Sequence, residues 1–189
     1  MNTTGSSLHS LSEAAVNGTD DRVAHPKHWV AALVQSRCEK AVGEKLNKLN
    51  IENYVPTQWE VRQWSDRKKK IERVVIPMVV FVHIDKAEEK RLRTYSFIYK
   101  FVSYPGQYAA AVIPDSQIEQ LKYMLRNAES AVEMKERILE VGDKVRIARG
   151  PLQGLEGELC FIQSDKPMVA VRIDCLGFAC VNIAKSDIE

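Results

Sequence analysis

The sequence predicts an α+β protein in which a mixed sheet with helices is followed by a linker and a small C-terminal β-barrel. Two observations lead to this fold class. Segments with strand and helix periodicity alternate in the order β, α, β, β, α, β, α over residues 26–126. Over residues 140–189, short β-prone segments are instead separated by Gly, Pro and Asp, which is typical of a small barrel. The intervening residues 127–139 are charged and lack a strong apolar stripe, so we expect a linker there.

The N-terminal region predicts a tail, a strand and a helix. Residues 1–25 are rich in Ser, Thr, Asn and Gly and poor in apolar residues, so we expect a disordered tail. The apolar, β-prone run at residues 29–34 predicts a buried strand. Apolar residues then recur at helical spacing from Cys38 to Leu49, and Asn50 is a suitable helix terminator.

The middle of the chain predicts a hairpin followed by a long strand. Residues 53–64 have the pattern of an extended segment, and the basic stretch 65–70 is expected at the tip of the hairpin. Residues 71–84 give the strongest strand signal in the chain. Pro77 interrupts this signal, and a proline inside a strand implies an edge position or a bulge.

Two further helices and one strand complete the N-terminal part. Residues 85–96 predict a short helix, and residues 99–104 predict a strand before a Pro-Gly turn. The last helix is expected after Pro114 with Asp115 as its N-cap. Its single apolar face is formed by Ile118, Leu121, Leu125 and Ala128.

The composition is that of an ordinary soluble protein, with 45% hydrophobic and 28% charged residues. No apolar run reaches the roughly 18 residues that a membrane span needs, and the first residues lack the pattern of a secretory signal. We therefore expect a cytoplasmic protein with no membrane contact. No CxxC pair occurs, so we expect reduced thiols, no metal site and no cofactor; the cysteines are Cys38, Cys160, Cys175 and Cys180.

Positive charge is concentrated in one segment. The formal net charge is only +2, yet residues 62–73 hold six basic and two acidic residues. A concentrated patch on a near-neutral chain indicates a binding site, with solubility of an exposed hairpin tip as the alternative. Nearby Trp59 and Trp64 could stack on nucleobases. The candidate DNA-binding residues are Arg62, Arg67, Lys68, Lys69, Lys70 and Arg73.

The C-terminal residues resemble a KOW motif. Val141-Gly142-Asp143 leads into Val145-Arg146-Ile147, and Gly150-Pro151, Gly154 and Gly157 follow. A KOW barrel preceded by an αβ domain is similar to the NusG family of transcription elongation factors. The N-terminal counterparts are Trp29 to Val34, the helix with Glu39-Lys40 at its start, Pro77 to Val82, and Ile113-Pro114-Asp115.

Two departures make the chain more similar to specialised members of that family. Met78-Val79 stands where the family has Gly-Tyr after the strand proline, and Tyr95 to Ile98 stands where Thr-Pro-Gly-Val is typical. The resemblance is to the UpxY and RfaH types, and UpxY proteins act on capsular polysaccharide operons. It implies a transcription antiterminator that suppresses pausing and termination, with a housekeeping NusG elongation factor as the alternative.

The resemblance also implies three contact surfaces. The N-terminal domain would bind the clamp helices of the largest RNA polymerase subunit through Leu33, Ile76, Val79, Phe81, Phe101 and Tyr104. The basic hairpin would touch non-template or upstream DNA, or nascent RNA. The barrel would bind the termination factor Rho or a small-subunit ribosomal protein through Leu152, Leu155 and Leu176. For each apolar residue the alternative is an ordinary core position.

Weaker extensions of the nucleic-acid surface are Lys90, Arg91 and Arg93 in the second helix, and Gln35, Arg37 and Lys40 near the first turn. Two other function classes were weighed. An enzyme would need a nucleophile such as Cys38 beside His28 or His83, but no known catalytic motif is present. A KOW-type ribosomal or RNA-binding protein would leave the N-terminal domain unexplained. We therefore expect a factor without enzymatic activity.

Overall fold

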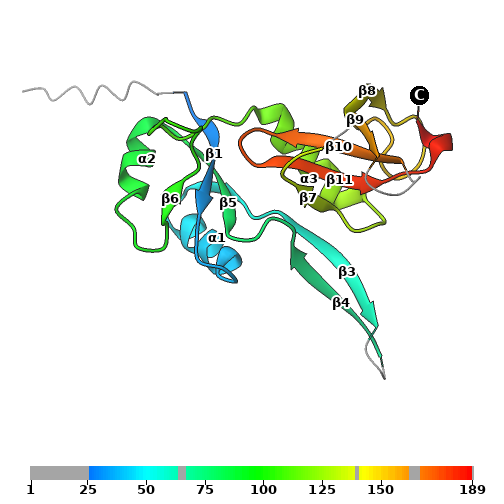
Figure 1. Ribbon diagram of the computed structural model, residues 1–189. Coiled ribbons are helices and arrows are strands. Elements are labelled where there is room, and N and C mark those ends of the chain that lie inside the picture. Colours follow the sequence, from blue (N-terminus) through cyan, green and yellow to red (C-terminus); the bar gives the residue numbers. More distant parts are fainter. Residues whose placement is uncertain (1–25, 64–66, 139–140, 162–166, 189) are drawn as a thin grey trace, which may run out of the picture.

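In the computed structural model of the chain, residues 26–63, 67–138, 141–161 and 167–188 are described (Figure 1). The N-terminal part is built around a four-stranded sheet in the order β2-β5-β1-β6. Its strands are β1 (His28–Leu33), β2 (Glu52–Tyr54), β5 (Val79–Ile84) and β6 (Lys100–Phe101). The expected strand at residues 29–34 is thereby confirmed, whereas the strand expected at residues 99–104 is reduced to two residues.

The strand pairings of this sheet are all antiparallel, although a mixed sheet was expected. The register explains the difference. Leu33 at the end of β1 lies opposite Val79 at the start of β5, and His28 lies opposite Ile84. The chain thus returns from its excursion through β3 and β4 to the end of the sheet where β1 finishes, so β5 runs against β1.

Three helices accompany the sheet, close to where the sequence places them. Helix α1 (Glu39–Lys48) is followed by Asn50, which has φ of 56° and so supplies the left-handed residue that ends a helix. Helix α2 (Lys86–Leu92) is shorter than expected. Helix α3 (Asp115–Asn127) starts one residue earlier than expected, because Pro114 is its N-cap and Asp115 is its first helical residue.

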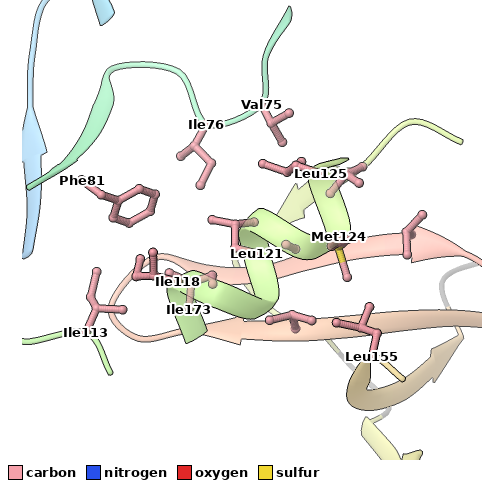
Figure 2. Close-up of a cluster of buried hydrophobic side chains, with 14 of the residues drawn as sticks. Val75, Ile76, Phe81, Ile113, Ile118, Leu121, Met124, Leu125, Leu155 and Ile173 are labelled. Carbon is pink, nitrogen blue, oxygen red and sulfur yellow. The ribbon is translucent and has the colours of Figure 1, made fainter. Parts of the chain in front are cut away.

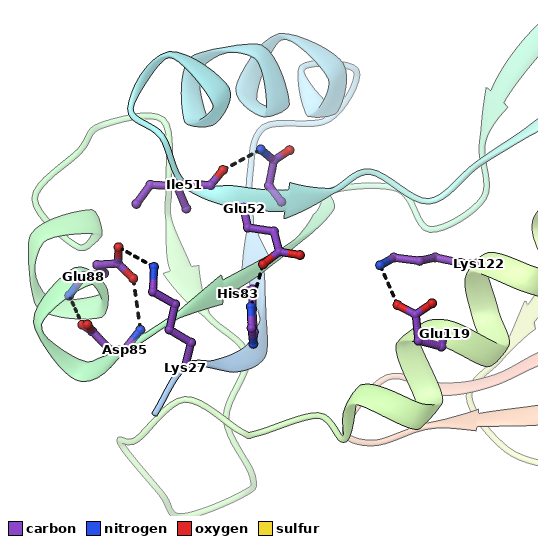
Figure 3. Close-up of polar contacts among 9 residues, drawn as sticks. Lys27, Ile51, Glu52, His83, Asp85, Glu88, Glu119 and Lys122 are labelled. Atoms are coloured by element: carbon purple, nitrogen blue, oxygen red, sulfur yellow. Dashed lines mark hydrogen bonds and ion pairs between the residues drawn. The ribbon is translucent and has the colours of Figure 1, made fainter. Parts of the chain in front are cut away.

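Helix α2 begins with a capping box, which explains its sharp start (Figure 3). Asp85 accepts a hydrogen bond of 2.8 Å from the Glu88 backbone N–H, and Glu88 accepts one of 3.2 Å from the Asp85 backbone N–H. Two N–H groups that lack a partner inside the helix are satisfied in this way. Lys27, just before β1, forms an ion pair of 3.0 Å with Glu88 and ties the first described residues to the helix.

A two-stranded antiparallel hairpin projects from the N-terminal part (Figure 1). It consists of β3 (Thr57–Gln63) and β4 (Lys68–Val74), so the expected hairpin is confirmed, although Lys68 to Lys70, expected at its tip, belong to β4 and pair with β3. The single strand expected over residues 71–84 is divided, because β4 ends before Pro77 and β5 starts after it. Met78, with φ of 65°, turns the chain between the two strands.

The C-terminal part is a five-stranded antiparallel sheet in the order β7-β11-β10-β9-β8. It comprises β7 (Glu133–Lys135), β8 (Val141–Arg146), β9 (Glu156–Phe161), β10 (Pro167–Ile173) and β11 (Gly177–Asn182), and a short 3-10 helix (Lys185–Asp187) follows. Because β7 pairs with β11, part of the segment expected to be a linker is a strand of this sheet.

Helix α3 is packed between the two sheets (Figure 2). One continuous apolar cluster contains Phe81 of β5, Leu121 and Met124 of α3, Leu155 just before β9, and Ile173 of β10. Two hydrogen bonds lie at the edge of this contact. The Gln117 side chain accepts from the Asp174 backbone N–H at 2.8 Å, and the Tyr123 hydroxyl donates to the Gln153 carbonyl at 2.7 Å.

A second cluster fills the other face of the N-terminal sheet, where residues of β1 and β5 meet α1 and α2, among them Val30, Leu46, Val82 and Leu92. Because side chains alternate along β1 and β5, one face of the sheet packs against α3 and the other packs against α1 and α2. None of the helices in the described part of the chain is long and apolar enough to cross a membrane.

Candidate functional site

The base of the hairpin is fixed to the body by buried hydrogen bonds. Gln58 is only 6% exposed, and its side chain donates to the Ser130 carbonyl and accepts from the Val132 N–H, both at 2.9 Å. Arg73 donates to the Val132 carbonyl at 3.0 Å. These bonds saturate polar groups that burial would otherwise leave unpaired, and they set the direction in which the hairpin leaves the body.

A further contact joins the hairpin to α1. Lys40 lies 2.5 Å from a Glu72 carboxylate oxygen, and the other oxygen accepts a 2.7 Å hydrogen bond from Thr57. The hydrogen bond from Lys40, followed by that from Thr57, lowers the pKa of the Glu72 carboxyl. Glu72 therefore stays ionised at neutral pH, and its bonds are lost only when the pH falls through that lowered pKa.

The candidate DNA-binding residues divide into exposed and engaged groups. Arg67, Lys68, Lys69 and Lys70 are all exposed, and no ion pair to a carboxylate is found for them within the described residues. Arg73, in contrast, bonds Val132 and lies 3.4 Å from Glu60, so its charge is used inside the protein. The side chains of Arg62 and Trp64 lie outside the described residues.

The register of the hairpin places aromatic, aliphatic and basic side chains on one face. Trp59, Val61 and Lys70 share this face, since Val61 lies opposite Lys70 and Trp59 is two residues away. Trp59 is 60% exposed and Val61 is 63% exposed. The Lys70 ammonium lies 5.1 Å from the centre of the Trp59 ring. An exposed aromatic ring beside unpaired cations is chemically suited to an unpaired nucleotide.

Among the weaker extensions of the basic surface, Lys40 contacts the hairpin through its ion pair with Glu72, and the others lie in α2 and in the turn after β1. In α2, Lys90 and Arg91 are exposed, while Arg93 is paired with Glu89 at 2.5 Å and lies over the Phe101 ring. Gln35 and Arg37 are exposed in the turn after β1. Lys40 reaches Glu72, which lies opposite Trp59 in the hairpin, but its charge is taken up by that carboxylate.

The six candidate polymerase-binding residues do not form one exposed surface. Ile76, Val79 and Phe81 are 6%, 4% and 0% exposed, because α3 covers their face of the sheet. Phe101 is also buried, but in the cluster on the opposite face. Leu33 is half-buried, and Tyr104 is exposed. Phe81 and Phe101 therefore occupy core positions, as the alternative interpretation holds.

Two exposed apolar residues that the sequence did not indicate, Tyr99 and Met78, are bonded through their backbones to the end of β1. The Leu33 carbonyl accepts from the Tyr99 N–H at 2.8 Å, and the Val34 N–H donates to the Met78 carbonyl at 2.9 Å. Tyr99 is 58% exposed and Met78 is 39% exposed. Met78 could have been noticed, because it is an apolar residue where the resemblance expects glycine.

The candidate partner residues of the C-terminal part are largely covered. Leu152 and Leu155 are 7% and 3% exposed and belong to the cluster around α3. Leu176 is half-buried in the turn between β10 and β11. Desolvation, followed by the negative charge of Asp174 in this turn, raises the pKa of Tyr104.

The cysteine and histidine residues do not assemble a catalytic pair in the described residues. His83 accompanies Phe81 on the α3 face of β5, where it bonds Glu52 at 2.7 Å (Figure 3). Its ring also stacks on Trp29. Cys38 packs against the cluster on the other face. His28 is at the far end of β1 from Cys38.

The remaining thiols are weak nucleophiles. Burial raises the pKa of Cys175 to about 11 and that of Cys180 to about 12. Cys160 and Cys180 are fully buried in a small cluster of the C-terminal sheet, where they act as small apolar residues. No group of three or more potential metal ligands occurs among the described residues.

Comparison with protein families decides the class of the chain. Residues 27–122 match the family model NusG, described as transcription termination factor nusG, and this match spans half of the chain. The chain belongs to the NusG family. Its members are transcription factors, and the matched residues contain the four-stranded sheet, the hairpin and the first part of α3. No curated protein matches the chain.

Two solved structures are similar over most of their length, at low identity. One, described as the domain interaction in Thermotoga maritima NusG, is 20% identical with a TM-score of 0.45, covering 86% of this chain and 96% of its own. The other, described as an MjSpt4:Spt5 complex in conformation B, is 16% identical with a TM-score of 0.25, covering 85% of this chain and 95% of its own. Neither similarity is high enough to assign residues.

The departure from the NusG pattern at position 78 has a measurable consequence. Met78 has φ of 65°, a conformation that costs an L-residue with a side chain about 1–2 kcal/mol. Met78→Gly should therefore raise the free energy of unfolding by about 0.5–1 kcal/mol, after the added freedom of glycine in the unfolded chain is subtracted. Urea unfolding of Met78→Gly and Met78→Ala would check this, because the alanine variant keeps the strain. Equal stability of the two variants would contradict it.

Proposed function

We propose that the chain is a non-enzymatic transcription antiterminator that binds RNA polymerase and suppresses pausing and termination. The observation that carries the proposal is the NusG-family N-terminal part with an exposed basic hairpin projecting from it. The family match supports the polymerase as partner. Arg67 and Lys68 to Lys70 of the hairpin are exposed and have no ion pair with a carboxylate among the described residues, which supports a contact with nucleic acid.

The polymerase contact would use the accessible part of the apolar surface. Phe81 and Phe101 are buried, so a partner could not touch them unless the fold rearranged. Leu33, Tyr99 and Tyr104 are at least partly exposed and could contact a partner directly. An apolar patch suits the tip of the clamp helices, because such contacts depend on desolvation and shape more than on charge. Ile76 and Val79 would contribute beneath it as supporting core residues.

Two contacts on one factor would act as a bridge. The apolar surface would hold the clamp, and the hairpin would hold non-template or upstream DNA, or nascent RNA. A ligand that binds the closed, active form of the polymerase more tightly shifts the population toward that form. The shift is limited by the difference in affinity between the two forms, and no substrate turnover or cofactor is needed.

The target would be a specialised set of genes, with capsular or exopolysaccharide operons as the expected class. Met78-Val79 and Tyr95 to Ile98, where the resemblance expects glycine-containing motifs, support a specialised role. The C-terminal sheet would form the KOW partner site for Rho or a ribosomal protein. Since Leu152 and Leu155 are covered by the contact with α3, such binding would require the two parts to separate.

In vitro transcription on a capsule-type leader and on an unrelated template tests this function. The expected result is fewer pauses and more read-through of terminators on the capsule-type leader only. Equal suppression on both templates would instead assign a housekeeping NusG role. Identical pausing with and without the chain on both templates would exclude antitermination. Co-purification with ribosomes and not with polymerase would favour the KOW-type ribosomal alternative.

The hairpin contact has its own quantitative test. Replacing Lys68, Lys69 and Lys70 by alanine should leave the fold intact, because all three side chains are exposed. Each lost phosphate contact on a duplex removes about 0.9 from the dependence of log affinity on log salt, so the slope should shrink by up to about 3. The measurement is affinity for the elongation complex over a series of salt concentrations. An unchanged slope would mean that the hairpin cations are solvated and do not contact nucleic acid.

A further inference from the structure

A hollow lies where the hairpin meets α3, on the side of the exposed tryptophan. It has a volume of about 510 Å³, which is in the range of pockets that hold a small ligand or one nucleotide. Trp59 from β3 and Tyr54 from β2 provide aromatic walls, and Leu125 of α3 is a buried apolar residue in its lining. The charged residues in its described lining are Lys70, Lys122 and Arg126.

The hollow is lined by cations without a carboxylate among its described lining residues. Arg126 is exposed in the last turn of α3, and neither it nor Lys70 has an ion pair with a carboxylate in the described part of the chain. Lys122 forms a 2.8 Å ion pair with Glu119, which offsets part of its charge (Figure 3). Two cations are thus left to attract an anion.

A second, neighbouring hollow differs from the hairpin hollow in the charges that line it. On the other side of α3, a larger hollow of about 830 Å³ is shared with the C-terminal sheet. Lys122 and Arg126 border it too, but Glu119 and Glu156 also line it. The two carboxylates balance the two cations there, whereas the charged residues in the described lining of the hairpin hollow are all cations, so the hairpin side is the better anion site.

The aromatic wall is arranged for stacking. Trp59 is 60% exposed even though its ring borders the hollow, and Lys70 lies 5.1 Å from the ring centre. Since more than half of the Trp59 side chain is exposed, part of its surface beyond the contact with Lys70 is accessible to a planar partner. An indole with cations beside it is the combination that holds an unpaired base and its adjoining phosphate.

We propose that the hollow between the β3–β4 hairpin and α3 binds single-stranded nucleic acid, with an unpaired base on Trp59 and phosphates on Lys70 and Arg126. This inference rests on the proposed function and deepens it. It makes α3 part of the nucleic-acid-binding surface. It also specifies that the ligand is a single strand with unstacked bases and not a duplex. Both the non-template DNA strand and nascent RNA offer this chemistry.

The test is fluorescence anisotropy of the full chain with labelled oligonucleotides of about 12 unpaired thymidines or uridines and with a duplex of similar length. Trp59→Ala should weaken single-strand binding roughly 5- to 150-fold, the range of one lost base stack. Trp59→Phe should retain most of the affinity, and duplex binding should change little. Preference for thymidine or for uridine identifies DNA or RNA as the source of the strand.

Arg126→Ala should reduce the salt slope for single strands by about 0.7, the value for one phosphate. Lys48→Ala is the matched control, because Lys48 is an exposed cation in the last turn of α1 and lies away from the hollow. An equal slope change in both variants would mean a general charge effect and would overturn the site.

Single-strand binding that is undetectable, or that is unchanged in Trp59→Ala, would also overturn the inference. Such a result would leave the proposed function standing if the chain still suppresses pausing on the capsule-type leader. If the unmodified chain binds single strands but does not suppress pausing, the proposed function alone is excluded. The two failures are therefore distinguishable.

Discussion

Phe81→Ala is expected to lower the free energy of unfolding by about 3–5 kcal/mol, the range for removing a large aromatic side chain from a core. Phe81 is 0% exposed and lies in the centre of the N-terminal sheet, where β5 pairs with both β1 and β2. Its ring stacks on Tyr54 at 6.2 Å between centres, and Ile118 and Leu121 of α3 belong to the same cluster. Alanine would leave a cavity that these neighbours cannot close completely.

Urea unfolding followed by circular dichroism measures this loss. Tyr104→Ser is the matched control on the proposed polymerase surface, because Tyr104 is 39% exposed and should lose less than about 1 kcal/mol. A polymerase pull-down with Phe81→Ala would report unfolding as much as contact, whereas Tyr104→Ser separates the two. A loss below about 1 kcal/mol for Phe81→Ala would contradict its place in the core.

The sequence predicted best where one period continued over many residues. Helices α1 and α3 were placed within one residue of their observed starts, because apolar residues recur on one face and Asn50 or Pro114 marks an end. Strand β1 was predicted because its short apolar run has both faces buried. These signals are local, so the distant parts of the chain do not alter them.

Local signals failed where one β-prone run spans two strands. Residues 71–84 read as one strand because the run from Val74 to Ile76 continues the end of β4 towards the apolar residues of β5. The positive φ of Met78 divides them, and a methionine gives no sign of that conformation. Gln58 was missed for a similar reason, since its role depends on Ser130 and Val132, more than seventy positions further along the chain.

The candidate surfaces were harder to predict than the elements, because burial depends on what covers a face. The resemblance named Val79 and Phe81 as contact residues, but the sequence could not show that α3 would cover them. Helix α3 carried a signal of its second contact. Met124 is fully buried beside the predicted apolar face, and a wider apolar arc is typical of a helix packed on two sides.

Gly177→Ala is the second large effect, with an expected loss of about 2–5 kcal/mol. Gly177 has φ of 109°, where an L-residue with a side chain is strained by about 1–2 kcal/mol or more. A Cβ atom there would also lie 2.3 Å from the Lys135 carbonyl oxygen, a backbone atom of β7. Forcing extra volume into packed structure adds about 1–3 kcal/mol.

Gly154→Ala separates the two contributions, because Gly154 has φ of 87° but a Cβ atom there would meet nothing within 4 Å. It should lose only the backbone part, about 1–2 kcal/mol. Urea unfolding gives both losses, and hydrogen exchange should show early opening of β7 and β11 in Gly177→Ala alone, since the collision is at their pairing. Equal losses in the two variants would mean that β7 moves aside at little cost. The pairing of β7 with β11 would then contribute little to holding the C-terminal sheet against α3.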